Sequence, residues 1–277
     1  FREAPCLVAT HCEHTPTVRV NEAAARARFG DVVPVDQHPV IRDDAVCYAS
    51  SSQAVDLARR YGTRLHVLHL TTAKELSLFA PGTSAGKRIT CEACVHHLWY
   101  SDADYATHGS LIKCNPAIKS AADRDALRAA VREGRIDVLA TDHAPHTHEE
   151  KARPGISAPS GLPYAQHALP ALLDLVHQGV FDLELIAERY AHNVARLFAI
   201  RDRGAIVPGL AADLVVVDPD AVVPVHDRDV LSKCGWSPFA GTELRGRVDH
   251  TLVNGRLAWS DGRIDDTVRG ARLFFHR

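Results

Sequence analysis

Four short apolar runs, separated by segments with helical periodicity, constrain the fold of this chain more than any other feature. The runs cover residues 7–11, 65–70, 89–94 and 136–141. Between them, residues 51–61 and 122–133 carry apolar side chains at i, i+3 and i+4 spacing. Serines from Ser51 onwards are predicted to cap the first segment, and Gly134 ends the second. Alternating strands and helices are typical of a parallel sheet with helical crossovers. The sequence therefore predicts an α/β protein whose strands are buried on both faces.

A different pattern begins near residue 205. Residues 204–209 and 212–218 are predicted to be β structure, and Asn254-Gly255 separates two apolar runs within residues 250–259. Asn-Gly between apolar runs is the strongest short-range signal for a β-hairpin. We therefore predict two parts, residues 1–204 and residues 205–277, of which the second carries strands of a small β domain.

Composition excludes several classes of function. The 277 residues include 32 Lys and Arg against 34 Asp and Glu, for a net charge of -2. Such a chain lacks the basic excess that neutralises nucleic-acid phosphates. No apolar run approaches the roughly 18 to 20 residues that span a bilayer, and no signal-peptide pattern opens the chain. We therefore expect a cytoplasmic protein that binds neither nucleic acid nor membranes.

The seven cysteines do not suggest a disulfide framework, because their number is odd and the chain is long. Cys91 and Cys94 have the spacing of a zinc knuckle, but no second pair follows them. Alternation along a strand also sends these two side chains to opposite faces. They are predicted to be buried thiols.

Three of the four predicted strands end in residues that can bind a metal. These are His11, His69 and Asp142. Functional sites of parallel α/β proteins form at the carboxyl ends of the strands. Two imidazoles and a carboxylate suit Zn²⁺. A single histidine in such a place is more often a hydrogen-bonded structural residue, so the pattern alone leaves both interpretations open.

Other members of the set of 17 histidines are less suited to this site. His66 lies three residues before His69, on the opposite face of the strand, and is predicted to be a packed residue. Of the neighbours His96 and His97, at most one is expected to reach the site. The segment from His146 to His148 has the pattern of a loop, which favours substrate contact over a pair of metal ligands.

Several segments of the sequence resemble a known family. Residues 140–146, Ala-Thr-Asp-His-Ala-Pro-His, are similar to the C-terminal signature of the dihydroorotases. The similarity covers essentially the whole chain in the same order. It includes residues 9–13, 65–72, 95–98, 115–119 and 233–241.

The resemblance implies a zinc-dependent hydrolase with a (β/α)₈ barrel and two zinc ions. Such an enzyme interconverts N-carbamoyl-L-aspartate and (S)-dihydroorotate in de novo pyrimidine biosynthesis. By resemblance, His11 and His69 bind one zinc ion, and Asp142 binds the other and acts as the general acid and base. Asn115 and His146 correspond to residues that hold the substrate.

The resemblance has three further implications. The backbone near Gly161 is also expected to contact the substrate. The segment from Thr147 to Gly161 is rich in polar residues, Gly and Pro, and is predicted to be a mobile loop over the site. Because members of this family commonly dimerise, a homodimer is implied as well.

Parts of the family pattern have no counterpart in this sequence. A His-x-His pair and a carboxylated lysine are absent, and the chain begins with Phe1 rather than Met. We therefore expect the C-terminal portion of a longer enzyme, with barrel strands five to eight and part of a small β-sandwich domain. Four parallel strands cannot close a barrel. The remaining ligands are expected to hold at most one zinc ion weakly, and the chain alone to have little activity.

Two alternatives stay open. One is another cyclic amidohydrolase, such as a dihydropyrimidinase, a hydantoinase or an allantoinase. Dihydroorotate differs from those substrates by its ring carboxylate, for which Asn115 and His146 are suitable partners. The other is a non-catalytic dihydroorotase-like partner protein, which is expected to have lost its metal ligands.

Overall fold

The computed structural model describes residues 1–260 and 262–276. The chain forms two compact units, one of residues 1–166 and 226–240, the other of residues 167–225 and 241–277. These units do not follow the predicted boundary after residue 204, because the helix of residues 168–177 contacts the second sheet. The boundary itself stays a prediction.

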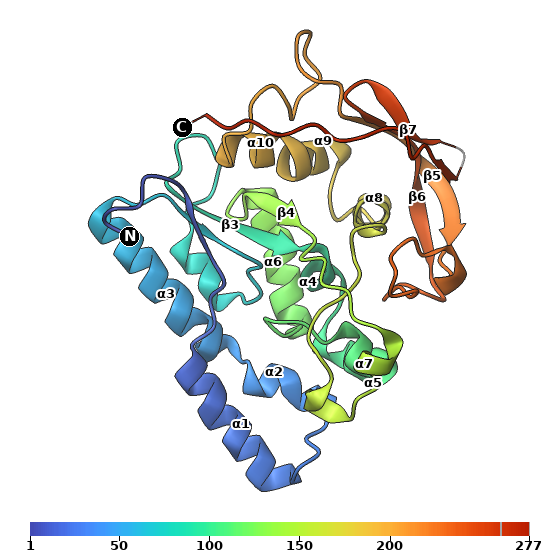
Figure 1. Cartoon of the computed structure of the whole chain (residues 1–277). Helices are drawn as coiled ribbons and strands as arrows, with labels where there is room; N and C mark the ends of the chain where they lie inside the picture. The colour runs from blue at the N-terminus through green and yellow to red at the C-terminus, as the bar shows by residue number, and fades with distance from the viewer. Residues whose placement is uncertain (261, 277) are drawn as a thin grey trace. The chain divides into compact units, whose positions relative to one another are not determined.

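The first unit contains a parallel sheet in the order β1-β2-β3-β4, of which Figure 1 labels β3 and β4. Its strands are Val8–Thr10 (β1), Leu65–Val67 (β2), Ile89–Cys94 (β3) and Val138–Ala140 (β4). Each strand lies inside one of the four apolar runs, so the predicted α/β architecture with a parallel sheet is confirmed. Thr10 pairs with Val67, and Cys94 pairs with Ala140. This register aligns the carboxyl ends of neighbouring strands.

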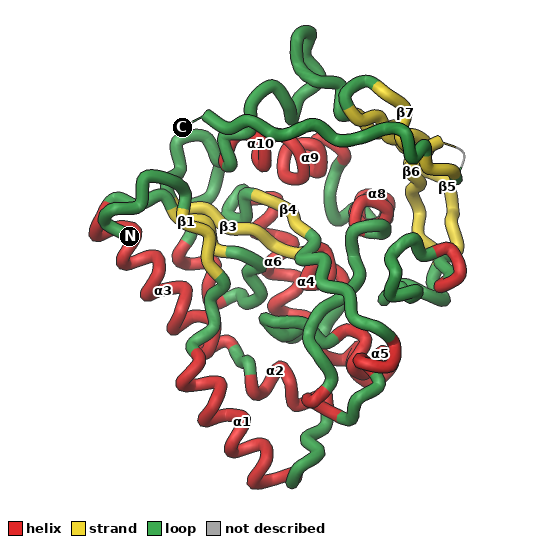
Figure 2. The backbone as a smooth tube through the Cα atoms, viewed as in Figure 1, coloured by secondary structure: helices red, strands yellow, loops and turns green. Residues whose placement is uncertain are grey.

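Figure 2 shows the helices of this unit in red. They are Thr15–Phe29 (α1), His38–Ile41 (α2), Asp44–Tyr61 (α3), Val95–Trp99 (α4), Tyr105–His108 (α5), Ala121–Glu133 (α6) and His148–Lys151 (α7). Helix α6 ends at Gly134, which adopts the left-handed conformation (φ 71°), as predicted.

Helix α3 begins seven residues before the predicted start at residue 51. The side chain of Asp43 accepts a hydrogen bond from the backbone N–H of Val46, at 2.9 Å, and so caps the helix. Ser51, which the sequence suggested as part of the cap, lies inside the helix and donates to the carbonyl of Cys47. The predicted cap was therefore wrong, because the hydroxyl finds a partner one turn earlier in the same helix.

The second unit contains an antiparallel sheet and three short helices. Its elements are Ala168–His177 (α8), Leu183–Ala187 (α9), Asn193–Leu197 (α10), Leu214–Pro224 (β5), Glu243–Val253 (β6), Arg256–Ser260 (β7) and Arg263–Ile264 (β8). The predicted hairpin at Asn254-Gly255 is confirmed, since β6 pairs with β7 across these residues. Helix α8 packs against β6, where a Cβ on Gly246 (φ 114°) would lie 2.3 Å from the Cβ of Leu173.

The prediction of β structure at residues 204–209 was wrong. This segment consists of turns and bends, and Ile206 is 87% exposed. Gly204 and Gly209 both have positive φ, at 91° and 96°, which interrupts any extended run. The apolar residues of the segment therefore reflect neither a strand nor a core.

The cysteines are free, and five of the seven are buried, in agreement with the predicted absence of a disulfide framework. Within the part of the chain that the structure describes, no helix combines the length and hydropathy that crossing a membrane requires.

Candidate active site

Two of the predicted metal ligands meet at the carboxyl ends of neighbouring strands. His11 follows β1 directly and His69 follows β2. The Nδ1 atom of His11 lies 3.0 Å from the Nε2 atom of His69, and the rings are nearly perpendicular. Thr10 and Val67 are paired in the sheet, so the register of β1 and β2 brings these rings together.

A carboxylate fixes the orientation of His11. Glu13 accepts a hydrogen bond from His11 Nε2 at 3.0 Å and also forms an ion pair with Arg42. Burial alone raises the pKa of Glu13, but the bond to His11 and the charge of Arg42 outweigh it and lower this pKa. Glu13 is therefore ionised at neutral pH and holds the imidazole in one orientation, as carboxylates behind metal-binding histidines do. Sequence analysis missed this role, although Glu13 lies only two residues after His11.

The backbone is unusual at two of the three predicted ligands. His69 and Asp142 have positive φ values of 37° and 45°. Non-glycine residues adopt this conformation at a cost of about 1–3 kcal/mol, and they cluster at functional sites. Burial lowers the pKa of His69, and the neighbouring His11 lowers it further, while Asp142 acts in the opposite direction. His69 is therefore neutral, which is the form that binds metals.

The geometry of the two histidines fits a shared zinc ion. With Zn–N distances of 2.0–2.1 Å, two nitrogen ligands of a tetrahedral ion are about 3.3 Å apart. The 3.0 Å between His11 Nδ1 and His69 Nε2 is close to this separation. Asp142 acts on His69 electrostatically but does not form a compact ligand group with both histidines.

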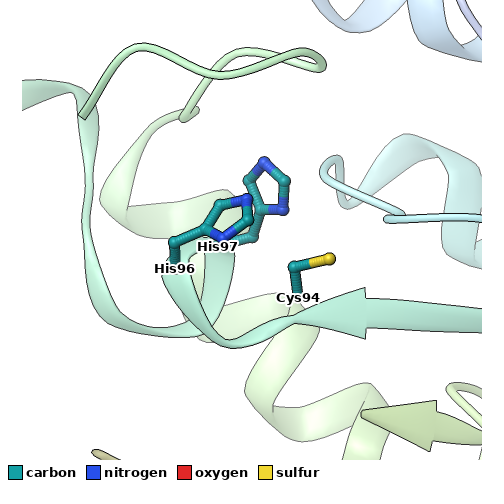
Figure 3. A group of neighbouring side chains, drawn as sticks. All are labelled: Cys94, His96 and His97. Atoms are coloured by element: carbon teal, nitrogen blue, oxygen red, sulfur yellow. The ribbon is translucent and has the colours of Figure 1, made fainter. Parts of the chain in front are cut away.

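The described residues contain one group of three side chains whose ligand atoms all lie within 4.8 Å of one another. It consists of Cys94, His96 and His97 (Figure 3). The rings of His96 and His97 have centroids 4.2 Å apart. We expected at most one of these histidines to reach a site, because adjacent residues of a strand face opposite ways. The strand ends at Cys94, however, and the helical turn of α4 brings both rings together.

His66 is a buried residue with hydrogen-bonded ring nitrogens, in agreement with its predicted role in packing. Its Nδ1 atom lies 2.9 Å from Thr90 Oγ1, and its Nε2 atom lies 3.1 Å from Glu92 Oε2. His66 therefore lies outside the candidate ligand set.

The predicted substrate-binding residue Asn115 is held by a histidine that sequence analysis missed. His38 Nε2 lies 2.9 Å from the carbonyl oxygen of Cys114 and 3.1 Å from Asn115 Oδ1. Burial lowers the pKa of His38 to about 3, so the ring is neutral. Because both partners are acceptors, Nε2 is the donor. The amide nitrogen of Asn115 is thereby turned away from His38 and can donate elsewhere.

His146 and Gly161 lie in contact. A Cβ on Gly161 (φ 144°) would be 2.4 Å from the carbonyl oxygen of Ala144 and 3.2 Å from Cδ2 of His146. The backbone N–H of Gly161 donates to the carbonyl of Lys113, two residues before Asn115. The structure therefore brings Gly161 next to the His146 side chain and joins it to the segment that carries Asn115.

A buried lysine anchors the loop that carries these contacts. Lys151 is fully buried, and its Nζ atom donates to the carbonyls of Lys113, Pro159 and Gly161, each at 3.0 Å. Burial lowers its pKa to about 8, so the side chain is an ammonium group with three N–H donors at pH 7. The loop is also ordered at residue 147 by a capping box, and its predicted mobility stays a prediction.

We expect Gly161→Ala to lower the free energy of unfolding by about 3 kcal/mol, because the new methyl group must displace backbone atoms and the φ value is unfavourable. Gly62→Ala is the matched control. Gly62 also has positive φ, but a Cβ there meets nothing within 4 Å, so a loss of about 1 kcal/mol is expected. Urea denaturation of both variants checks this, and equal losses would contradict the close contact at Gly161.

Comparisons with known proteins find similar sequences over most of the chain. The sequence profile of the amidohydrolase family matches residues 8–258. A dihydroorotase of Halobacterium salinarum is 40% identical over 97% of this chain and 61% of its own length. A dihydroorotase of Lactiplantibacillus plantarum is 37% identical over 76% of this chain and 49% of its own length. The chain thus spans about half to three fifths of the length of these curated relatives.

Solved structures of similar proteins show the same fold. An L-hydantoinase (dihydropyrimidinase) from Arthrobacter aurescens superimposes with a TM-score of 0.85 at 24% identity, covering 93% of this chain and 58% of that one. A dihydropyrimidinase from Brevibacillus agri gives a TM-score of 0.85 at 20% identity, covering 95% and 59%. At these identities the likeness concerns the fold alone.

Proposed function

The chain belongs to the amidohydrolase family, and from that premise we propose that it serves a hydrolase acting on a cyclic amide. We further propose that the reaction is the interconversion of N-carbamoyl-L-aspartate and (S)-dihydroorotate. The observation that carries the proposal is the contact between His11 and His69 at two strand ends, with Glu13 behind it. Dihydroorotases among the relatives, at up to 40% identity, support the choice of substrate.

The proposed metal is Zn²⁺, held by His11 and His69, with Asp142 as ligand to a second ion. Bound zinc supplies two effects, since it lowers the pKa of water to about 7 and polarises the carbonyl to be attacked. Glu13 fixes the ring of His11 so that Nδ1 faces His69 Nε2, and these two nitrogens would hold the ion.

The residues of the chain perform the remaining steps. The Asp142 carboxylate takes a proton from the attacking water as the new C–O bond forms at the ring carbonyl carbon. It then delivers this proton to the ring nitrogen as the C–N bond breaks. The Asn115 amide, turned outward by His38, and His146 are proposed to bind the ring and its carboxylate.

The charges near Asn115 favour a substrate with a carboxylate. Besides burial, the positive charges of Lys113, Arg42 and Lys119 lower the pKa of His38, the partner of Asn115, so these cations lie within electrostatic range. Dihydroorotate carries a ring carboxylate, whereas hydantoins and dihydropyrimidines need none. This is the reason to prefer dihydroorotate over the substrates named for the structural relatives.

We also propose that the parallel sheet corresponds to strands five to eight of a (β/α)₈ barrel and that the second sheet is part of a small β-sandwich domain. The order β1-β2-β3-β4, without a change of direction, supports this. Little activity of the 277-residue chain alone, a homodimer and a cytoplasmic location stay predictions.

The test is a ring-opening assay of the full-length natural protein, with and without added Zn²⁺. Dihydroorotate, dihydrouracil and hydantoin are compared side by side. We expect zinc-dependent turnover with kcat/KM for dihydroorotate at least about 100-fold above the other two. Dihydrouracil and hydantoin lack the ring carboxylate and therefore lose its buried charged contact with the protein. If the folded, zinc-loaded protein opens hydantoin but not dihydroorotate, the proposed substrate is wrong and another cyclic amide takes its place.

Glu13→Gln should weaken zinc binding at the strand ends by about 10- to 100-fold, because an amide orients the His11 ring less strongly than a carboxylate does. Competition with a chromophoric chelator measures the affinity. Glu22→Gln is the control, since Glu22 is an exposed carboxylate paired with Arg26 on α1. An unchanged zinc affinity in the Glu13 variant would show that Glu13 does not support a metal ligand.

A further inference from the structure

The side chains of Cys94, His96 and His97 converge in the interior, where β3 passes into α4. Figure 3 shows the two imidazole rings side by side, with the thiol next to them. The three residues are at most 3% exposed. Because Cys94 is the last residue of the strand and the histidines lie in the first turn of the helix, three ligand atoms lie within 4.8 Å of one another.

His97 Nε2 lies 3.0 Å from the carbonyl oxygen of Pro116, but the other three ring nitrogens of the cluster have no hydrogen-bond partner among the described residues. These atoms are Nδ1 and Nε2 of His96 and Nδ1 of His97. The hydroxyl of Tyr164, whose ring contacts that of His96, likewise has no partner among those residues. An unsatisfied buried polar atom costs about 1–3 kcal/mol. Several such atoms at one place call for a bound species that satisfies them.

A divalent metal ion would satisfy one ring nitrogen of each histidine. One thiolate and two imidazoles are a ligand set typical of Zn²⁺. Ligands of a tetrahedral zinc ion are about 3.3–3.6 Å apart, so binding requires the three atoms to approach by about 1 Å. Neutral imidazoles are ready ligands, and burial lowers the pKa of His96 to about 3.

We propose that Cys94, His96 and His97 form a buried zinc site, separate from the one at the strand ends. Coordination converts the thiol to a thiolate, and the proton is released to solvent. The two sites differ in chemistry, because His11, His69 and Asp142 offer only nitrogen and oxygen, whereas this one includes sulfur. The inference does not depend on the proposed function.

Cobalt substitution tests the proposal, because Co²⁺ bound to a thiolate gives an intense charge-transfer band in the near ultraviolet, whereas nitrogen and oxygen ligands do not. The metal-free 277-residue chain is titrated with Co²⁺ in a background of Cys6→Ser and Cys234→Ser, which removes the two cysteines that are not buried. We expect a thiolate band that saturates at one equivalent and disappears when Zn²⁺ is added.

Variants of the cluster and control variants show which residues give rise to the thiolate band. Cys94→Ser and His96→Gln should abolish it or weaken cobalt binding by at least 100-fold. Cys91→Ser is the matched control, since Cys91 is also fully buried in β3 but bonds to the carbonyl of Arg135. His11→Ala should leave the band unchanged while removing the strand-end site.

A folded starting protein that binds Co²⁺ without a thiolate band would overturn the proposal. So would a band that survives Cys94→Ser. If Cys94→Ser does not fold, the titration of the starting protein and of His96→Gln still decides. Ring-opening activity plays no part in this readout, so a failure of the proposed function cannot be mistaken for a failure of the buried site.

Discussion

The Asp142→Asn variant of the full-length protein should open dihydroorotate about 10³-fold more slowly than the wild type, within the range expected for loss of a general acid and base. Asparagine preserves the size of the side chain and tolerates the positive φ of 45° at this position. It cannot, however, carry a proton between water and the ring nitrogen. Steady-state kinetics with zinc content measured on the same samples checks the effect.

The comparison that isolates this role is Asp125→Asn, an exposed carboxylate of α6 that pairs with Arg124. Its kcat should equal that of the wild type. An Asp142→Asn protein with full zinc content and kcat within tenfold of the wild type would remove Asp142 from the proton transfer. A loss of activity that follows only the loss of zinc would leave it as a metal ligand alone.

Lys151→Met should lower the free energy of unfolding by about 3–5 kcal/mol. Methionine retains most of the apolar stem. The carbonyl of Lys113 keeps the N–H of Gly161 as a donor, but the carbonyls of Pro159 and Gly161 lose the ammonium group. Each buried carbonyl left without a donor costs about 1–3 kcal/mol. For a chain of this size the midpoint of thermal unfolding should fall by roughly 10 °C.

Lys74→Met is the control, because Lys74 is a half-exposed lysine paired with Asp44, and exposed pairs contribute at most about 1 kcal/mol. The Lys151 variant should also be cleaved faster by a protease within residues 147–161. If the two lysine variants are equally stable and equally resistant to the protease, Lys151 does not anchor the loop.

The sequence was sufficient to predict the sheet, because its strands are apolar runs between helices. It also predicted which residues follow the strand ends, and the register then brought His11 and His69 together. The hairpin of β6 and β7 was predictable from Asn254-Gly255 alone. Each of these predictions rested on a pattern within a short stretch of the sequence.

Two of the features that sequence reasoning missed depend on distant partners. His38 and Asn115 are 77 residues apart, and Lys151 reaches a carbonyl 38 residues away. A lysine within the run Glu-Glu-Lys has the pattern of a solvated surface, and nothing local shows that it is buried. Helix α1 was not predicted because it buries only Val18, which leaves a weak apolar periodicity.

At His69 and at Asp142, the positive φ value lowers the stability of the fold, whereas the side chain is proposed to serve activity. Glycine adopts such a conformation without strain, so replacing either residue with glycine would relax the backbone while deleting a proposed metal ligand. A search for more stable variants that scores folding alone would therefore accept the changes that most damage catalysis. Any engineering of this chain for heat resistance should hold these two positions fixed.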